Sequence, residues 1–117
     1  MTNSPKRGEV WFVDFNPTKG KEIHKIRPAV VISSDYIGKL PLKLVIPITE
    51  WQEAFKENIW HVQLIPSAEN GLKKASAVDA LQTRSVDVLR FKNKIGSIKD
   101  VQLLDILQAL AAVVELA

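Results

Sequence analysis

The sequence feature that most constrains the fold is a succession of short runs rich in Val, Ile, Phe and Trp, separated by Pro, Gly, Asn and Ser. Runs of this kind predict β-strands bounded by turns. The expected extended segments are residues 9–15, 26–33, 42–49, 60–64, 75–81, 82–88 and 94–96. Strands this short, separated by turn signals, favour a small, strongly bent sheet or barrel, so we expect a mainly β fold.

The last segment of the chain has the pattern of a helix. Ser97-Ile98-Lys99-Asp100 has the spacing of a capping box, which predicts that the helix begins there. One apolar stripe at helical spacing is expected to form the buried face: Val101, Leu104, Leu107, Ala111 and Val114.

The same segment is not expected to cross a membrane. Asp105, Gln108 and Glu115 interrupt it, and charged and polar side chains are costly in hydrocarbon. The first residues also lack the apolar run of a secretory signal. We therefore expect a cytoplasmic protein without a membrane partner.

Length and composition set further limits. A chain of 117 residues fits a single domain, which we expect to span residues 1–117. With 46% hydrophobic and 25% charged residues the chain is typical of a globular protein. The absence of cysteine excludes disulfides, thiolate catalysis and cysteine-based zinc sites. A net charge of +3 is compatible with nucleic-acid binding without requiring it.

The sequence offers little for a metal or a cofactor. It has no glycine-rich nucleotide fingerprint, no phosphate-loop lysine and no His-Glu-x-x-His motif. His24 and His61 are the only histidines, and the carboxylates are scattered. We therefore expect no metal, no cofactor and metal-free chemistry.

Residues 16–25 break the periodicity with Pro and Gly and are expected to form a long loop. Basic side chains are concentrated at this loop, namely Lys19, Lys21, His24, Lys25 and the following Arg27. This favours binding of an anion, although lysines in an exposed loop are otherwise simply solvated. Because histidine titrates near neutral pH, His24 is also a candidate proton shuttle.

Two side chains stand at the ends of predicted strands. Arg27 directly precedes Pro28, which biases it toward an extended backbone and fixes its direction. Its guanidinium suits a phosphate, or alternatively a surface ion pair. Thr49 ends its strand and offers a hydroxyl to a phosphoryl oxygen, or alternatively serves only β-propensity.

A third position lies in the expected segment 82–88. Gln82 and Arg84 flank Thr83, so the two-residue period of a strand points them to one face. Such a pair suits base edges or phosphates, or is simply a polar outer face. In the neighbouring strands, His61 is expected at the surface. The tryptophans are expected to pack in the core or a dimer interface rather than to stack on bases: Trp11, Trp51 and Trp60.

Several motifs occur in the order seen in one family of proteins. The chain resembles the MazF/PemK ribonuclease toxins from about Lys6 to its end. The matching segments are Arg7-Gly8-Glu9-Val10-Trp11, Asn16-Pro17-Thr18-Lys19-Gly20-Lys21-Glu22, Arg27-Pro28-Ala29-Val30-Val31-Ile32, Pro47-Ile48-Thr49, Gly71-Leu72-Lys73-Lys74, Gln82-Thr83-Arg84-Ser85-Val86-Asp87 and Ile95-Gly96.

The resemblance implies an SH3-like barrel with a C-terminal helix and a symmetric homodimer. It also implies a groove for single-stranded RNA, in which a cognate antitoxin places an extended tail. Arg27 matches the arginine and Thr49 the threonine that these enzymes use for catalysis, while Gln82 and Arg84 match a Gln-x-Arg segment near the groove. Some relatives carry an acid directly before that glutamine, whereas this chain has Leu81 there and its nearest acid is Asp79.

The activity implied is metal-independent, sequence-selective cleavage of RNA, in which the 2′-hydroxyl of the substrate attacks the neighbouring phosphate. Arg27 would stabilise the transition state, Thr49 would supply a second donor, and the general base stays unassigned. Lys19, Lys21, His24 and Lys25 would bind substrate. Two alternatives remain, a gyrase-binding toxin of the CcdB type and a noncatalytic RNA-binding barrel.

Overall fold

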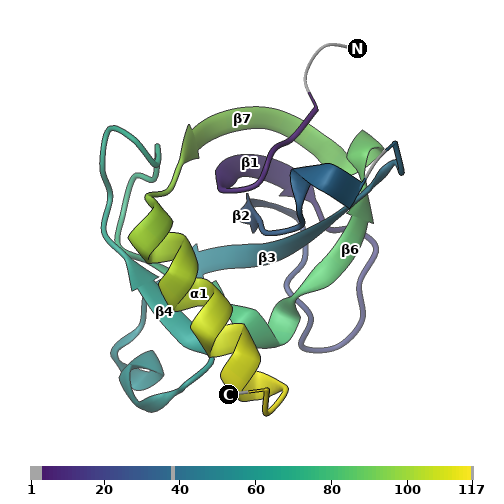
Figure 1. Cartoon of the computed structure of the whole chain (residues 1–117). Coiled ribbons are helices and arrows are strands. Elements are labelled where there is room, and N and C mark those ends of the chain that lie inside the picture. The colour runs from purple at the N-terminus through teal and green to yellow at the C-terminus, as the bar shows by residue number, and fades with distance from the viewer. Residues whose placement is uncertain (1–3, 38, 117) are drawn as a thin grey trace.

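The computed structural model describes residues 4–37 and 39–116. It contains seven strands and one α-helix, with four short 3₁₀ turns between them (Figure 1). The strands are β1 (Glu9–Asp14), β2 (Ile26–Val31), β3 (Leu42–Glu50), β4 (His61–Leu64), β5 (Ser76–Asp79), β6 (Arg84–Asp87) and β7 (Phe91–Ser97). The helical segments are η1 (Asp35–Ile37), η2 (Glu53–Glu57), η3 (Ala80–Gln82), η4 (Val88–Arg90) and α1 (Asp100–Val113).

The strands form one antiparallel sheet in the order β4-β5-β3-β2-β1-β7, and β6 pairs with β3 beside this path. The long strand β3 pairs with β6 along its first part, with β2 along its middle and with β5 along its end, so the sheet must bend around it. The mainly β fold with a C-terminal helix is confirmed. Within the described residues the strand pairing does not close into a complete ring, so the sheet is strongly curved but open.

Two apolar clusters lie against this sheet. In the neighbouring strands β2 and β3, Val30 and Ile46 belong to one cluster, whereas Val31 and Val45 belong to the other. This alternation is what the two-residue period of a strand produces when both faces of a sheet are buried. The first cluster includes Leu103 and other side chains of α1, which crosses the sheet beside β3 and β4 (Figure 1).

The helix begins and packs differently from the sequence prediction. Ser97 ends β7, and the first turn is capped from Lys99, whose main-chain N–H donates to Gln102 Oε1 at 2.8 Å. The buried side chains are Leu103, Ile106 and Ala109. Of the predicted stripe, Leu107 is partly buried against the core, but Val101, Leu104 and Val114 are exposed, so for these three the prediction is wrong. Because apolar residues occur almost all round this helix, periodicity alone could not decide which stripe faces the sheet.

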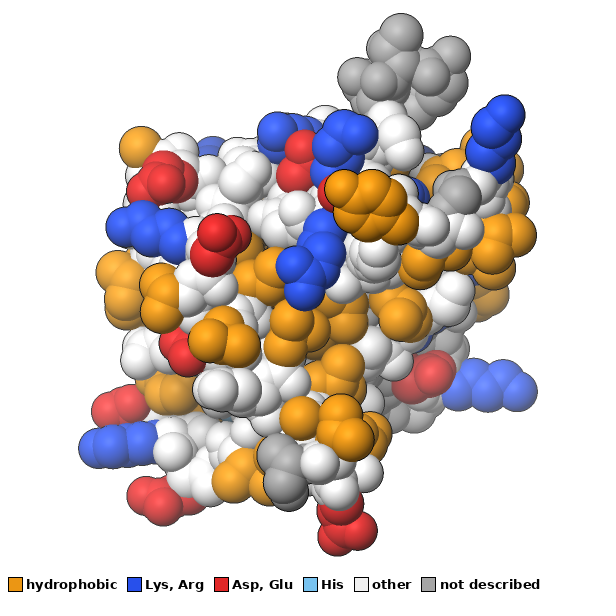
Figure 2. All heavy atoms as spheres, viewed as in Figure 1, with side chains coloured by type: hydrophobic (Ala, Val, Ile, Leu, Met, Phe, Trp, Pro, Cys, Tyr) orange, Lys and Arg blue, Asp and Glu red, His pale blue; other side chains and the backbone are white. Residues whose placement is uncertain are grey.

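That choice leaves an apolar face uncovered. Val101, Leu104 and Val114 are 61%, 54% and 62% exposed. Figure 2 shows apolar side chains across this side of the molecule, over α1. In the part of the chain that the structure describes, no helix is long and apolar enough to cross a bilayer.

His61 is not at the surface as predicted, because its side chain is only 6% exposed. Its ring stacks on Phe55 with centroids 3.8 Å apart, and its Nε2 lies 3.6 Å from Asp79 Oδ2. The turn η2, which carries Phe55, folds over β4 and supplies this cover. For Trp11, packing is confirmed, since it is 6% exposed and meets Phe91 edge to face.

Candidate functional site

Arg27 and Thr49 come together at the open ends of two neighbouring strands. The pairing of Ala29 with Pro47, continued two residues along β2 and β3, sets Arg27 opposite Thr49. Both side chains are partly buried, and both line the same two cavities. The sheet register therefore joins two residues that lie 22 positions apart in the sequence.

The two cavities open on either side of this pair. The smaller one, about 280 Å³, is formed with the basic loop and is lined by Gly20, Lys21, Glu22, Ile23, His24, Arg27 and Thr49. The larger one, about 640 Å³, extends away from the loop and is bordered by the segment Gly71–Lys74. The Arg27 guanidinium is held by a hydrogen bond from its Nε to the carbonyl of His24, at 3.4 Å. Arg27 and Thr49 thus offer adjacent hydrogen-bond donors to an anion lying between the two cavities.

Gln82 fastens the basic loop to the sheet. Its Oε1 accepts a hydrogen bond from the main-chain N–H of Ile23 at 3.0 Å, and its Nε2 donates to the carbonyl of Lys21 at 3.2 Å. Gln82 ends the turn η3 rather than lying in an extended segment, so the predicted common face with Arg84 does not follow from a strand period. The two side chains still line one cavity of about 490 Å³ together with Lys21.

Two further arginines tie down the start of the loop. Arg84 lies over the ring of Phe15, 5.6 Å from its centroid, and its Nη1 is 3.5 Å from the carbonyl of the same residue. Arg90, which the sequence did not single out, donates from Nη1 to the carbonyls of Asp14 and Asn16. Both guanidinium groups therefore brace the junction of β1 and the loop.

Lys19 and Lys25 are exposed on the same loop but line neither cavity at Arg27. The main-chain N–H of Lys19 donates to the Glu22 carboxylate at 2.6 Å, which closes a local turn. Lys25 has a positive φ of 67° and its N–H donates to Asn16 Oδ1 at 3.1 Å. Of the predicted loop side chains, the structure brings Lys21 and His24 to the Arg27–Thr49 pair.

Asp79 supports the turn that carries Gln82. Its Oδ1 accepts a hydrogen bond from the N–H of Leu81 at 3.1 Å, and the same carboxylate faces His61. Burial raises the pKa of the Asp79 carboxyl, against the opposing effects of His61 and the Leu81 N–H. Burial likewise lowers the pKa of His61, against the attraction of Asp79. Asp79 thus caps η3 and does not lie among the residues that line the cavities at Arg27.

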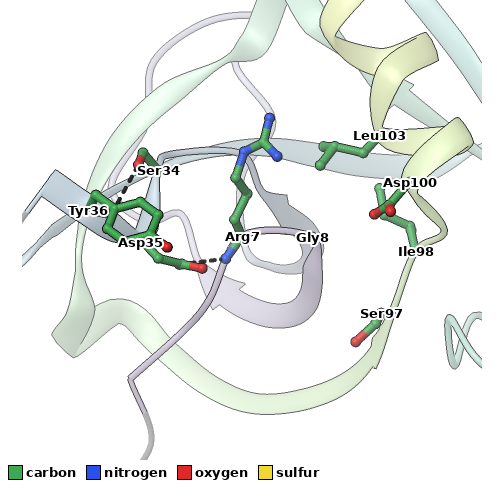
Figure 3. Close-up of a pocket in the computed structure, with 9 residues that line it drawn as sticks. All are labelled: Arg7, Gly8, Ser34, Asp35, Tyr36, Ser97, Ile98, Asp100 and Leu103. Atoms are coloured by element: carbon green, nitrogen blue, oxygen red, sulfur yellow. Dashed lines mark hydrogen bonds between the residues drawn. The ribbon is translucent and has the colours of Figure 1, made fainter.

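A separate hollow of about 580 Å³ lies between η1 and the start of α1 (Figure 3). Arg7 extends into it between Tyr36 and Leu103, and its main-chain N–H donates to Asp35 Oδ1 at 2.9 Å. None of the residues predicted for chemistry lines this hollow. Among residues 4–37 and 39–116, no three or more His, Cys, Asp or Glu side chains are grouped as a metal site would require.

The role of Gln82 as a loop fastener can be measured. We expect Gln82→Ala to raise the hydrogen-exchange rate of the Ile23 amide by about tenfold, the loss of roughly 1.4 kcal/mol of protection from one hydrogen bond. The matched control Gln82→Glu keeps an acceptor for Ile23 and should retain this protection, while amides in β2 should not change. Unchanged exchange at Ile23 in Gln82→Ala would mean that the loop holds its own shape.

Comparison with known proteins identifies the family. A family model described as PemK-like, MazF-like toxin of type II toxin-antitoxin system matches residues 6–114. Endoribonuclease MazF9 of Mycobacterium tuberculosis is 31% identical over 112 residues, covering 90% of this chain and 92% of that protein.

Solved structures agree with the fold. MazF from Deinococcus radiodurans superposes with a TM-score of 0.81 at 23% identity, over 97% of this chain and 98% of that one. An endoribonuclease from a mycobacterial species, solved in complex with its cognate antitoxin, gives 0.76 at 17% identity over 97% and 98%. With its sequence matched almost from end to end, the chain belongs to the PemK-like and MazF-like toxins of type II toxin-antitoxin systems.

Proposed function

We propose that this chain, acting as a single domain, is a metal-independent endoribonuclease that cuts single-stranded RNA at selected sequences in the cytoplasm. The observation that carries the proposal is the meeting of Arg27 and Thr49 between two cavities, beside a loop rich in lysine. The name of the relative MazF9, an endoribonuclease, supports the same reaction.

The reaction needs no nucleophile beyond the 2′-hydroxyl of the RNA itself. The substrate 2′-oxygen forms a bond to the adjacent phosphorus, the bond to the 5′-oxygen breaks, and a cyclic phosphate and a free 5′-hydroxyl result. The proton of the 2′-hydroxyl goes to a base, and the leaving oxygen takes up a proton. Arg27, always protonated, stabilises the charge that grows on the phosphoryl oxygens, and the Thr49 hydroxyl donates a second hydrogen bond.

The remaining side chains bind and position the RNA. Lys19, Lys21 and Lys25 attract the phosphate backbone, and His24 lies close enough to Arg27 to contact the nucleotide at the cut. Arg84 lines the neighbouring cavity and extends the cationic surface. Gln82 acts in substrate binding through the loop that it holds.

The natural partner that restrains this activity is a cognate antitoxin. Support comes from the similar mycobacterial endoribonuclease, which was solved with its own antitoxin. An antitoxin segment that covers Arg27 and the larger cavity would exclude RNA from both.

Cleavage in EDTA is the direct test of the proposed function. We expect purified protein to cut a long single-stranded RNA at a recurring sequence with EDTA present. The new ends should carry a cyclic or 3′-phosphate, because the internal nucleophile is the only one required. Activity that disappears on chelation and returns with magnesium or zinc would overturn the metal-free mechanism.

The active form is a homodimer with two-fold symmetry, the commonest closed assembly. The uncovered apolar side chains of α1 support this arrangement, since a second copy would remove them from water. We expect sedimentation at micromolar concentration to give twice the chain mass of 13.1 kDa. Leu104→Glu, which places a charge on the exposed face of α1, should shift the protein to monomer; a wild-type monomer would contradict the assembly.

A further inference from the structure

The larger cavity beside Arg27 is lined by both apolar and basic side chains, as a site for a nucleotide would be, whereas the loop 16–25 is mainly polar and basic. We propose that it is a base-binding subsite, in which Phe12 stacks on a base that flanks the scissile phosphate and Lys73 binds the next phosphate along the chain. This inference rests on the proposed cleavage of RNA and deepens it, because it names the part of the molecule that reads sequence.

The floor of the cavity is apolar. Phe12 lies opposite Pro28 in the pairing of β1 with β2, and both line the space. Ile48 and Leu72, buried members of the core cluster next to α1, complete this floor together with Ile95. Phe12 is only partly buried and lines the cavity, so part of it is accessible to a ligand there. A flat apolar base is the part of RNA that gains most from such a surface.

The segment Gly71–Lys74 forms one wall of the cavity, and the residue before it, Asn70, is held rigidly. The side chain of Asn70 is 1% exposed and accepts hydrogen bonds from the N–H groups of Ser67 and Leu72, at 3.0 and 2.9 Å. It also donates from Nδ2 to the carbonyl of Ile65 at 2.9 Å. A buried amide with its bonding capacity used in this way fixes the segment before any ligand arrives.

Two glycines press this wall against β7. A Cβ atom added at Gly71 would lie 2.0 Å from the carbonyl oxygen of Ile95, and Gly71 has a positive φ of 70°. A Cβ atom added at Gly96 would lie 2.3 Å from the carbonyl oxygen of Glu69. The segment therefore cannot move closer to β7, because the backbones already touch there.

The rim of the cavity carries the charge that a nucleic acid requires. Lys74 pairs with Glu50 at 3.2 Å, which offsets one of the two lysines. Lys73 is exposed and, among the residues that the structure describes, has no acidic group within 4.0 Å. Arg27 and Lys73 both line the cavity, so two cations lie beside its apolar floor, as phosphates flank a base along a strand.

The experiment couples a change in the protein to a change in the RNA. Short substrates carry the cut sequence with one abasic ribonucleotide at each position on either side of the scissile bond. Single-turnover cleavage is measured at subsaturating enzyme, where the rate constant reports kcat/KM, for the wild type and for Phe12→Leu. At one flanking position the abasic change should slow the wild type about tenfold, the effect of one lost base–aromatic stack. Phe12→Leu should cut this abasic substrate almost as fast as it cuts the intact substrate, because the variant already lacks the stack.

A second variant tests the other end of the cavity and does not depend on the ring. Lys73→Ala should weaken RNA binding and lower the slope of log affinity against log salt by about 1. Replacing the linkage next to the Phe12-sensitive base by a neutral methylphosphonate should weaken wild-type binding but not Lys73→Ala binding. Lys92→Ala, an exposed lysine on β7 that does not line the cavity, is the control and should still respond to the neutral linkage.

The outcomes separate this inference from the function beneath it. RNA that is never cut by the wild type overturns both. A different result would be that the RNA is cut but every abasic position slows Phe12→Leu as much as it slows the wild type. This result would be consistent with the proposed nuclease activity and would overturn the stacking role of Phe12. If Phe12→Leu fails to fold, the lysine variants still test the subsite. If the neutral linkage weakens RNA binding by Lys73→Ala as strongly as binding by Lys92→Ala at every position, the subsite is overturned.

Discussion

Arg27→Ala should lower the single-turnover rate of RNA cleavage by about 10²-fold or more, the scale observed when one preorganised donor to a developing oxyanion is removed. The reason is that Arg27 lies between the two cavities, where the reacting phosphate would have to sit. Affinity for an uncleavable RNA should fall much less, because the loop lysines are expected to contact the RNA backbone in the variant too.

The matched comparison is a loop lysine that lies outside the cavities. Lys25→Ala should weaken RNA binding and its salt dependence while leaving the rate at saturation nearly unchanged. Thr49→Ala should behave like Arg27→Ala in kind, with a smaller loss of rate. Cutting at full rate by Arg27→Ala under saturating conditions would show that the guanidinium only attracts RNA.

Replacing the 2′-hydroxyl at the cut site by hydrogen should abolish cleavage while leaving binding nearly intact. This is the largest effect expected for the system, because the nucleophile itself is removed and no residue is proposed to replace it. The measurement is a time course on two oligonucleotides that differ at one sugar, beside an equilibrium titration of each.

Two controls make the deoxy result specific. A deoxy sugar placed several nucleotides away should leave the rate unchanged, and the same sequence in a duplex should be cut poorly because stacked bases present few readable edges. Rapid cutting of the deoxy-substituted strand would require a different nucleophile, and the assignment of Arg27 and Thr49 would have to be rebuilt around it.

The extended segments could be predicted because their signal is local. β2 and β3 lie within the predicted runs 26–33 and 42–49 apart from the last residue of β3, since both segments are rich in Val and Ile. The meeting of Arg27 with Thr49 also follows once these two strands pair. What the pattern could not give was the turn η3, where Asp79 and Thr83 bend the chain through local hydrogen bonds and remove Gln82 from the strand.

The errors arose where the outcome depends on contacts between elements. The His61 side chain is covered because Phe55 of η2 stacks on it, and the alternation of polar and apolar residues in the strand does not predict that contact. The buried face of α1 was predicted wrongly because two apolar stripes compete and only the shape of the sheet selects one. Lys73 and Phe12 were passed over for a related reason, since a lysine pair after a turn and an aromatic residue in a strand become a site only when a cavity joins them.

Because Arg27 and Thr49 lie on neighbouring strands rather than in loops, their relative position and the sequence preference of the protein can change independently in evolution. Arg27 and Thr49 lie two residues beyond the pair Ala29–Pro47, so their relative position follows from the pairing of β2 with β3, whereas the loop 16–25 and the segment 65–74 only connect strands. If Arg27 and Thr49 act as proposed, we expect that exchanging either connection with that of a relative will change the sequence preference while these two residues keep their positions. We therefore expect that nucleases with this fold can differ in the RNA sequence they cut, and that laboratory selection for a chosen cleavage sequence should begin with variation in these two connections.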